Sequence, residues 1–189
     1  MTREEEVKIL IAAAAAVSAF AMAGAASAQV YGTVGYSYLD GDKVNLGGVT
    51  GRVGWKSDTP FGVEAEGSIG TDKDTTAKGP TALRIHMAHQ WAGYVTATGK
   101  VTDTFSAMAR VGYGNMNVKT TQAATFAGAP VNFLENFNSW NYGVSGQWVY
   151  DGANGLRLDY TRMNLNGNRL KDFNNFSISW VHKFGVETK

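Results

Sequence analysis

The feature that most constrains the fold is an alternation of apolar and polar residues with a period of two. Successive side chains of a β-strand point to opposite faces, so this period predicts strands with one apolar and one polar face. The closing stretch shows it plainly, since Phe176, Ile178 and Trp180 alternate with small polar residues. Eight such segments follow one another: residues 29–39, 48–56, 62–70, 88–99, 105–114, 139–150, 156–161 and 175–184.

The connections between these segments alternate in length. The short ones, residues 57–61, 100–104 and 151–155, carry the Gly, Asp and Pro of tight turns. The others are longer: residues 40–47, 71–87, 115–138 and 162–174. Short turns on one side and long loops on the other are typical of an outer-membrane barrel, whereas a soluble sandwich has no reason to alternate in this way. The pattern predicts an all-β fold, an eight-stranded antiparallel up-and-down transmembrane β-barrel.

Aromatic residues gather near both ends of the predicted strands. The expected belts combine residues near the short turns (Trp55, Trp148, Tyr150 and Phe184) with residues near the long loops (Tyr38, Tyr113, Trp140 and Phe176). Tyr and Trp are enriched at both membrane interfaces, because their rings are apolar and their edges are polar. We therefore expect two aromatic girdles on the outer face of the barrel.

A targeting segment precedes the first strand. Residues 9–24 form an apolar run, and residues 26–28 give an A-x-A cleavage site ahead of Gln29. The run has 16 residues and a membrane-spanning helix needs about 20, which favours a cleavable signal peptide over an N-terminal anchor helix. Residues 1–28 are thus expected to be a signal peptide and residues 29–189 the barrel domain.

Composition excludes several kinds of function. Residues 29–189 contain 15 Lys and Arg against 13 Asp and Glu, a net charge of +2 that gives no indication of nucleic-acid binding. The chain has no cysteine, which excludes a disulfide framework and a thiol nucleophile. No metal, phosphate-loop or nucleophile-elbow motif is present, so we expect no cofactor and no catalytic residue.

The polar faces of the predicted strands carry eight charged residues that would point into the barrel. They are Arg52, Lys56, Glu64, Glu66, Arg110, Arg157, Asp159 and Lys183. An unpaired charge is costly inside a narrow lumen, so we expect ion pairs between neighbouring strands that plug it. Arg52 with Glu64 or Glu66 is the natural pair, and Asp159 can reach the neighbours of Arg157 or Lys183. A narrow charged conduit and a catalytic carboxylate pair remain the alternatives.

The histidines and the longest loop carry weaker signals. His86 and His89 lie outside any helix and lack a nearby carboxylate, so their spacing does not predict a metal site. His182, on the outward face of the last strand, is expected to be an interfacial residue. Loop 115–138 contains Phe126, Phe133 and Phe137. It is expected to pack over the barrel mouth or to touch a partner.

Taken together, the "ASAQ" at residues 26–29, the "ARVGYG" at residues 109–114 and the last strand ending in Phe184 resemble the small outer-membrane β-barrel proteins. This family includes the OmpA transmembrane domain, OmpX and the opacity proteins. The resemblance implies insertion into the outer membrane by the assembly machinery, with both termini periplasmic. It also implies an assembly signal made by Phe176, Ile178, Trp180 and Phe184, although "GVETK" follows Phe184 here.

The expected function is that of a non-enzymatic outer-membrane protein with a structural or surface-exposed role. Its partners would be outer-membrane lipid, the assembly machinery and an extracellular ligand or cell contacted by the loops. A small ion- or solute-conducting pore is the first alternative, and a lipid-modifying outer-membrane enzyme is a second. A soluble barrel that binds an apolar ligand is a weaker one, because the charged face would then have to point outward.

Overall fold

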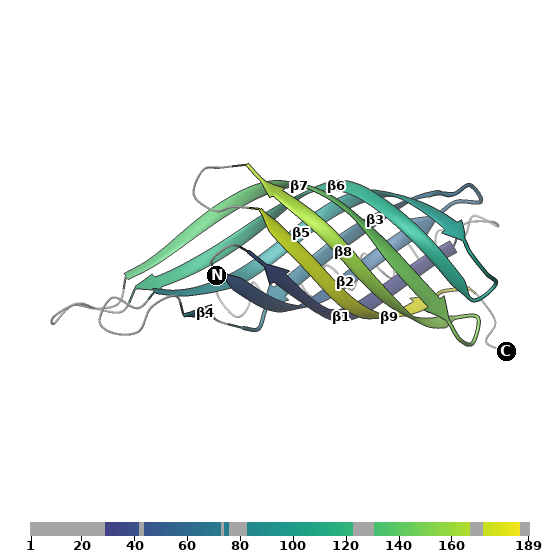
Figure 1. Ribbon diagram of the computed structural model, residues 1–189, viewed down its shortest axis with the longest axis horizontal. Coiled ribbons are helices and arrows are strands. Elements are labelled where there is room, and N and C mark those ends of the chain that lie inside the picture. The colour runs from purple at the N-terminus through teal and green to yellow at the C-terminus, as the bar shows by residue number, and fades with distance from the viewer. Residues whose placement is uncertain are drawn as a thin grey trace.

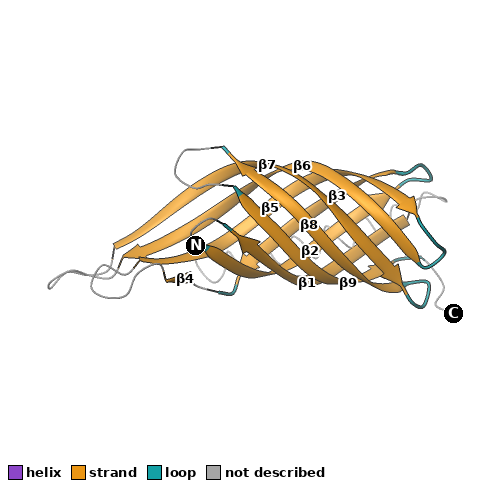
Figure 2. Cartoon of the chain, viewed as in Figure 1, coloured by secondary structure: helices purple, strands orange, loops and turns teal. Residues whose placement is uncertain are grey.

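The computed structural model describes residues 29–41, 44–72, 74–75, 83–122, 131–166 and 172–185. The predicted signal peptide, residues 1–28, lies outside the described residues, as does Phe126. The described part of the chain consists of strands and turns (Figure 2). No helix in it has the length and apolarity needed to cross a membrane.

The strands wind into a closed barrel (Figure 1). They are β1 (Gln29–Asp40), β2 (Asn45–Lys56), β3 (Phe61–Gly70), β4 (Asp74–Thr75), β5 (Leu83–Lys100), β6 (Phe105–Gln122), β7 (Val131–Val149), β8 (Asn154–Leu165) and β9 (Phe173–Lys183). All pairings are antiparallel between neighbours, and β9 pairs with β1 to close the ring. The two-residue β4 only borders β5, so eight strands form the wall and the predicted fold is confirmed.

The two ends of the barrel differ. Short turns at residues 57–60, 101–104 and 150–153 lie together at one end, on the right in Figure 2. In the last of them Gly152 has a φ of 85°, a conformation that glycine adopts without strain. At the opposite end β5, β6 and β7 project beyond the other strands (Figure 1). We call these the short-turn end and the loop end.

The predicted loop boundaries at the loop end were wrong. Residues 83–87, 115–122 and 131–138 were expected in loops, yet they extend β5, β6 and β7. The alternation of apolar and polar residues continues through β6, but the apolar residues change from the outer to the inner face. Val111 and Tyr113 point outward, whereas Met116 and Val118 point inward. A search for one apolar face therefore loses the strand at this reversal.

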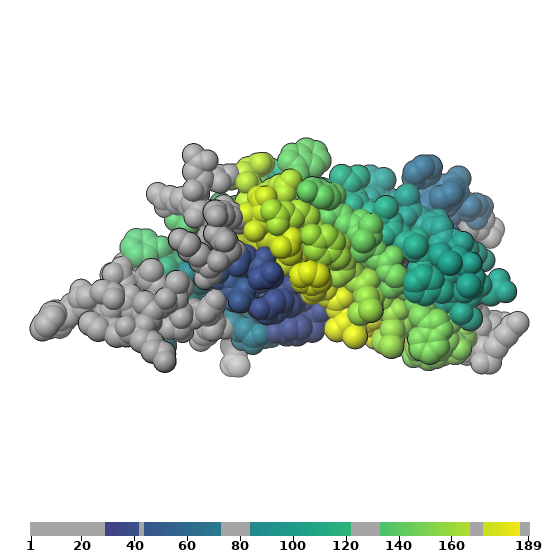
Figure 3. All heavy atoms as spheres, in the orientation of Figure 1, coloured from purple at the N-terminus to yellow at the C-terminus, as the bar shows by residue number. Residues whose placement is uncertain are grey.

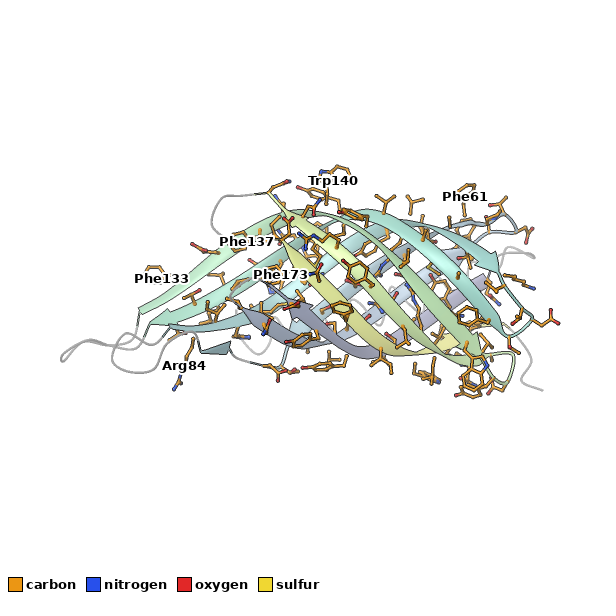
Figure 4. The ribbon with its side chains drawn as sticks, in the orientation of Figure 1. Phe61, Arg84, Phe133, Phe137, Trp140 and Phe173 are labelled. Carbon is orange, nitrogen blue, oxygen red and sulfur yellow. The ribbon has the colours of Figure 1, made fainter. Side chains whose placement is uncertain are left out.

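Along the wall, large apolar side chains face outward and polar ones face inward. Val34, Val144 and Leu158 on β1, β7 and β8 are 51%, 59% and 61% exposed. Phe61 and Trp140 project outward toward different ends of the barrel (Figure 4). Side chains cover the outside as a continuous layer over β8 and β9 (Figure 3). Over most of its length the barrel is thus apolar outside and polar inside, the reverse of a soluble protein.

Candidate functional site

Six inward charges meet in one cluster inside the barrel, which we call the ion layer. Its members are Arg52 on β2, Glu64 and Glu66 on β3, Arg110 on β6, and Arg157 and Asp159 on β8. None of the six side chains is more than 1% exposed. Three positive and three negative charges balance, so the layer as a whole is neutral.

Glu64 accepts from several donors across the lumen. Arg157 Nη1 donates to Glu64 Oε2 at 2.6 Å and Arg110 Nη1 donates to Glu64 Oε1 at 3.0 Å. The Tyr31 hydroxyl donates to Glu64 Oε2 at 2.9 Å. Gly54 opposite leaves room for the Tyr31 ring, because a Cβ there would collide with it. Buried charges are tolerated when such hydrogen bonds satisfy them.

The other two carboxylates complete the layer. Glu66 Oε2 accepts from Arg52 Nε at 2.6 Å and from Arg110 Nη1 at 3.1 Å. Asp159 accepts from Arg157 Nε at 2.8 Å and from Arg52 Nη1 at 3.2 Å. Each carboxylate therefore lies against at least two guanidinium groups, and charge-assisted hydrogen bonds compensate its negative charge.

Small hydroxyl residues and one aromatic ring surround the arginines. Arg52 also donates to the hydroxyls of Ser177 at 2.8 Å and Ser179 at 3.0 Å. Arg110 donates through Nε to Thr161 at 3.1 Å, and its guanidinium lies 4.5 Å from the centre of the Tyr94 ring. These contacts occupy donors that the carboxylates leave free and hold the guanidinium groups in place.

An apolar layer fills the lumen at the loop end. Its buried members are Leu39, Val44, Leu46, Met87, Met116, Val118, Phe137, Met163 and Phe173. Phe137 and Phe173 lie in this part of the barrel (Figure 4). Phe137 was expected in a loop that packs over the mouth or touches a partner. It packs inside the mouth and is 6% exposed.

Lys56 and Lys183 do not join the ion layer. Neither forms an ion pair with another described residue, and both line a cavity at the short-turn end together with Lys100. Asp159, for which Lys183 was one expected partner, lies against arginines instead. The two lysines are near the strand ends, while the acidic partners are near the strand centres.

The residues expected in the aromatic girdles lie on the outer face. Seven are well exposed: Tyr38, Trp55, Tyr113, Trp140, Trp148, Tyr150 and Phe176. Phe184 is only partly exposed and packs edge-on against His182, with ring centres 4.9 Å apart. Ile178 and Trp180, expected in the assembly signal, are exposed on the same stripe of β9 as Phe176.

His89 and His182 each lie close to an asparagine side chain. His89 Nε2 lies 2.9 Å from the Asn117 amide, and His182 Nδ1 lies 2.9 Å from Asn154 Oδ1. Within the described ranges, no three His, Asp or Glu side chains lie close enough to hold a metal ion.

The sequence pattern did not single out Tyr31 and Tyr94, which contact the ion layer, or most of the apolar layer. Tyr31 is two residues from Thr33 on β1 and therefore lies on the same inward face. This spacing could have predicted its position. Tyr94 and Arg110 lie on the paired strands β5 and β6, where Tyr94 is opposite Gly112, so their contact is a diagonal one that depends on the strand register. The apolar layer could not be predicted from the alternation, because its residues lie where the apolar side chains change from the outer to the inner face.

The comparisons with known proteins agree with this architecture. The family model for the outer membrane protein beta-barrel domain matches residues 9–184. A comparison with curated protein sequences gives no match.

Two of the most similar solved structures are of Ail, the attachment invasion locus protein of Yersinia pestis. One is a complex with the heparin analogue sucrose octasulfate: it is 12% identical, covers 84% of this chain and 99% of Ail, and has a TM-score of 0.59. The second is 10% identical, covers 84% of this chain and 98% of Ail, and has a TM-score of 0.54. At this identity the likeness shows the fold. By its family match, the chain belongs to the outer-membrane β-barrel proteins and lies in the outer membrane.

Proposed function

We propose that this protein is a non-enzymatic outer-membrane barrel with a closed lumen, whose function lies in contacts made at the cell surface. The observation that carries this proposal is the ion layer, in which six charges fill the barrel interior and cancel one another. An eight-stranded barrel is just wide enough for side chains to fill its interior. The apolar layer adds a second seal on the loop side.

The projecting strands at the loop end provide the contact surface. In family barrels the long connections are extracellular and the short turns periplasmic. Phe133 and Leu134, near the outer end of β7, are 51% and 67% exposed, and Arg84 on β5 and Lys119 on β6 are exposed as well. Arg84 and Phe133 lie at this end in Figure 4. Apolar and basic side chains held on a paired hairpin suit contact with another surface.

Residues at the two ends of the chain belong to the proposal as well. Residues 1–28 direct export and are removed ahead of Gln29, which N-terminal sequencing of the mature protein tests. The outward stripe of Phe176, Ile178 and Trp180, followed by Phe184, is the surface that we assign to recognition by the assembly machinery. Both assignments accord with membership of the outer-membrane family.

The experiment is single-channel recording of the refolded protein in planar lipid bilayers. We expect no conductance above the protein-free bilayer. A steady conductance that changes when Arg110 or Glu66 is neutralised would replace this proposal with a pore. In parallel, a change in lipid A acylation on overexpression, abolished by His89→Ala, would replace it with a lipid-modifying enzyme.

The surface role is tested by binding of the protein in nanodiscs to immobilised candidates. Heparin is the first probe, because Ail was crystallised with a heparin analogue. We expect Phe133→Ala with Leu134→Ala to reduce binding to whichever surface the protein recognises. Val101→Ala, an exposed residue in a short turn at the other end, is the matched control. Equal losses in both variants would contradict a role for the loop end.

A further inference from the structure

The short-turn end of the lumen holds a cavity of about 80 Å³ whose lining carries a net positive charge. Lys56, Lys100 and Lys183 line it, from β2, β5 and β9, and Asp103 is the one carboxylate among its lining residues. None of the three lysines forms an ion pair with a residue that the structure describes. The lining therefore has a net charge of +2.

The cavity is closed on its inner side. Tyr31, Met108 and Val181 form a small buried cluster, and Tyr31 and Met108 also line the cavity. Beyond this floor lies the ion layer, to which Tyr31 is joined through Glu64. Because the ion layer is neutral, it supplies no net negative charge to the lysines. The cavity is a blind, positively charged pocket.

The lysines repel one another across this pocket. Lys183 is partly buried, and the positive charges of both Lys100 and Lys56 act on it. Like charges held near a low-dielectric wall are unfavourable, and the same wall strengthens attraction to an ion of opposite sign. An anion in the pocket would add an attraction to each lysine and so offset the repulsion between them.

Neutral donors and the size of the pocket narrow the choice of anion. Thr96, Thr98 and Gln147 also line the cavity and add hydroxyl and amide donors to the ammonium groups. A volume of about 80 Å³ is enough for a tetrahedral oxyanion. Lysine binds phosphate as a compact charge with three donors.

We propose that this periplasmic pocket binds a phosphate group, with Lys56, Lys100 and Lys183 as its cationic ligands. The site is separate from the loop-end surface and does not depend on the contacts proposed there. Its phosphate comes from a soluble phosphate compound or from the headgroup of a phospholipid. The chemistry at the lysines is the same in both cases.

The test is isothermal titration of the full barrel, refolded in an uncharged detergent at low ionic strength, with inorganic phosphate. We expect saturable binding with one site per barrel. Lys183→Gln and Lys100→Gln should each weaken it by about fivefold or more, the effect of losing one close charge. Arg162→Gln, near the loop end of β8, makes the same change in net charge and should leave the affinity unchanged.

Three results would overturn the proposal: absence of saturable binding, an equal loss in Arg162→Gln, or unchanged affinity in the pocket variants. Lys100 is exposed, so Lys100→Gln tests the site even if Lys183→Gln does not refold. Competition by a short-chain phosphatidic acid assigns the phosphate to a lipid headgroup, whereas competition by glycerol phosphate alone assigns it to a soluble compound.

Discussion

Arg157 Nη1 lies 2.6 Å from Glu64 Oε2 in the interior of the barrel, although 93 residues separate the two in the chain. Neither side chain has any exposed surface. Arg157 starts from β8 and Glu64 from β3, so the pair crosses the lumen and ties together strands that are not neighbours. Its geometry suggests that the ion layer contributes to the barrel's stability as well as to its closure.

Removing one member of this pair should destabilise the barrel strongly. Arg157 and Arg110 both contact the Glu64 carboxylate, and Glu64→Gln removes its negative charge. The positive charge that is then left buried and uncompensated should lower the free energy of unfolding by about 3–5 kcal/mol. Urea unfolding in detergent micelles, followed by tryptophan fluorescence, measures the change. Asp58→Asn, in an exposed short turn, is the control and should stay within about 0.5 kcal/mol of the parent.

The double variant Glu64→Gln with Arg157→Gln separates pairing from packing. It should lose less stability than the sum of the two single variants, because neither charge is then left alone. Strict additivity would show that the two side chains do not interact in the folded barrel.

The apolar layer predicts unequal effects of one substitution at two sites on the same strand. Phe137 is 6% exposed within the apolar layer, and Phe133 on β7 is 51% exposed. Phe137→Ala should cost about 3–5 kcal/mol of unfolding free energy, the range for a buried phenylalanine. Phe133→Ala should cost less than about 1 kcal/mol. Equal costs would argue that the apolar layer is not packed in the folded protein.

The lipid-facing wall predicts a dependence on depth. Leu158 on β8 and Val101 in a short turn are 61% and 62% exposed, so exposure alone does not distinguish them. Leu158→Lys should cost about 2–4 kcal/mol, since it places a charge near the bilayer midplane. Val101→Lys should cost at most about 1 kcal/mol, because the turn lies at the water interface. Unfolding in lipid vesicles gives both values, and a similar cost at both positions would contradict the lipid-facing assignment of β8.

The turn at residues 150–153 predicts a shifted titration. The Asn154 side chain donates to Asp151 Oδ2 at 2.6 Å, and the Asn154 and Ala153 amides donate to Oδ1, which lowers the pKa of the Asp151 carboxyl. A lowered pKa means that the carboxylate stabilises the folded turn above the unfolded pKa, and that this stabilisation is lost as the pH falls through the folded pKa. NMR titration of the carboxyl carbon should give a midpoint below the usual value of about 3.9.

Asn154→Ala is the matched variant for this titration. It removes the side-chain donor to Asp151 and leaves the two backbone donors in place. The midpoint should move upward toward the usual value, and an unchanged midpoint would show that the Asn154 side chain does not hold the carboxylate.

Much of the wall could be predicted from the sequence. Val34, Tyr36 and Tyr38 face outward and Thr33 and Ser37 face inward on β1, as the alternation indicated. Such alternation is visible wherever one face meets lipid and the other the lumen, because each side then selects one kind of residue. The short turns were visible for a related reason, since Gly, Asp and Pro favour chain reversal in any context.

The ends of β6 and β7 could not be predicted in this way. Beyond the membrane the outer face meets water, so apolar residues such as Met116 and Phe137 turn inward, and the strand no longer shows one continuous apolar face. The strand continues because its backbone pairs with the neighbour across this boundary, and backbone pairing leaves no mark on the choice of side chain.

The order of residues along the chain was enough to predict the period, the number of strands and the face on which each inward charge would lie. Which of these charges meet depends on how the barrel closes. Arg52 and Asp159 are 107 residues apart and approach to 3.2 Å, whereas Lys56, four residues from Arg52, is left at the mouth. The face on which a side chain lies is a local property of its strand. The height and angle at which side chains from different strands enter the lumen are set by closure of the barrel.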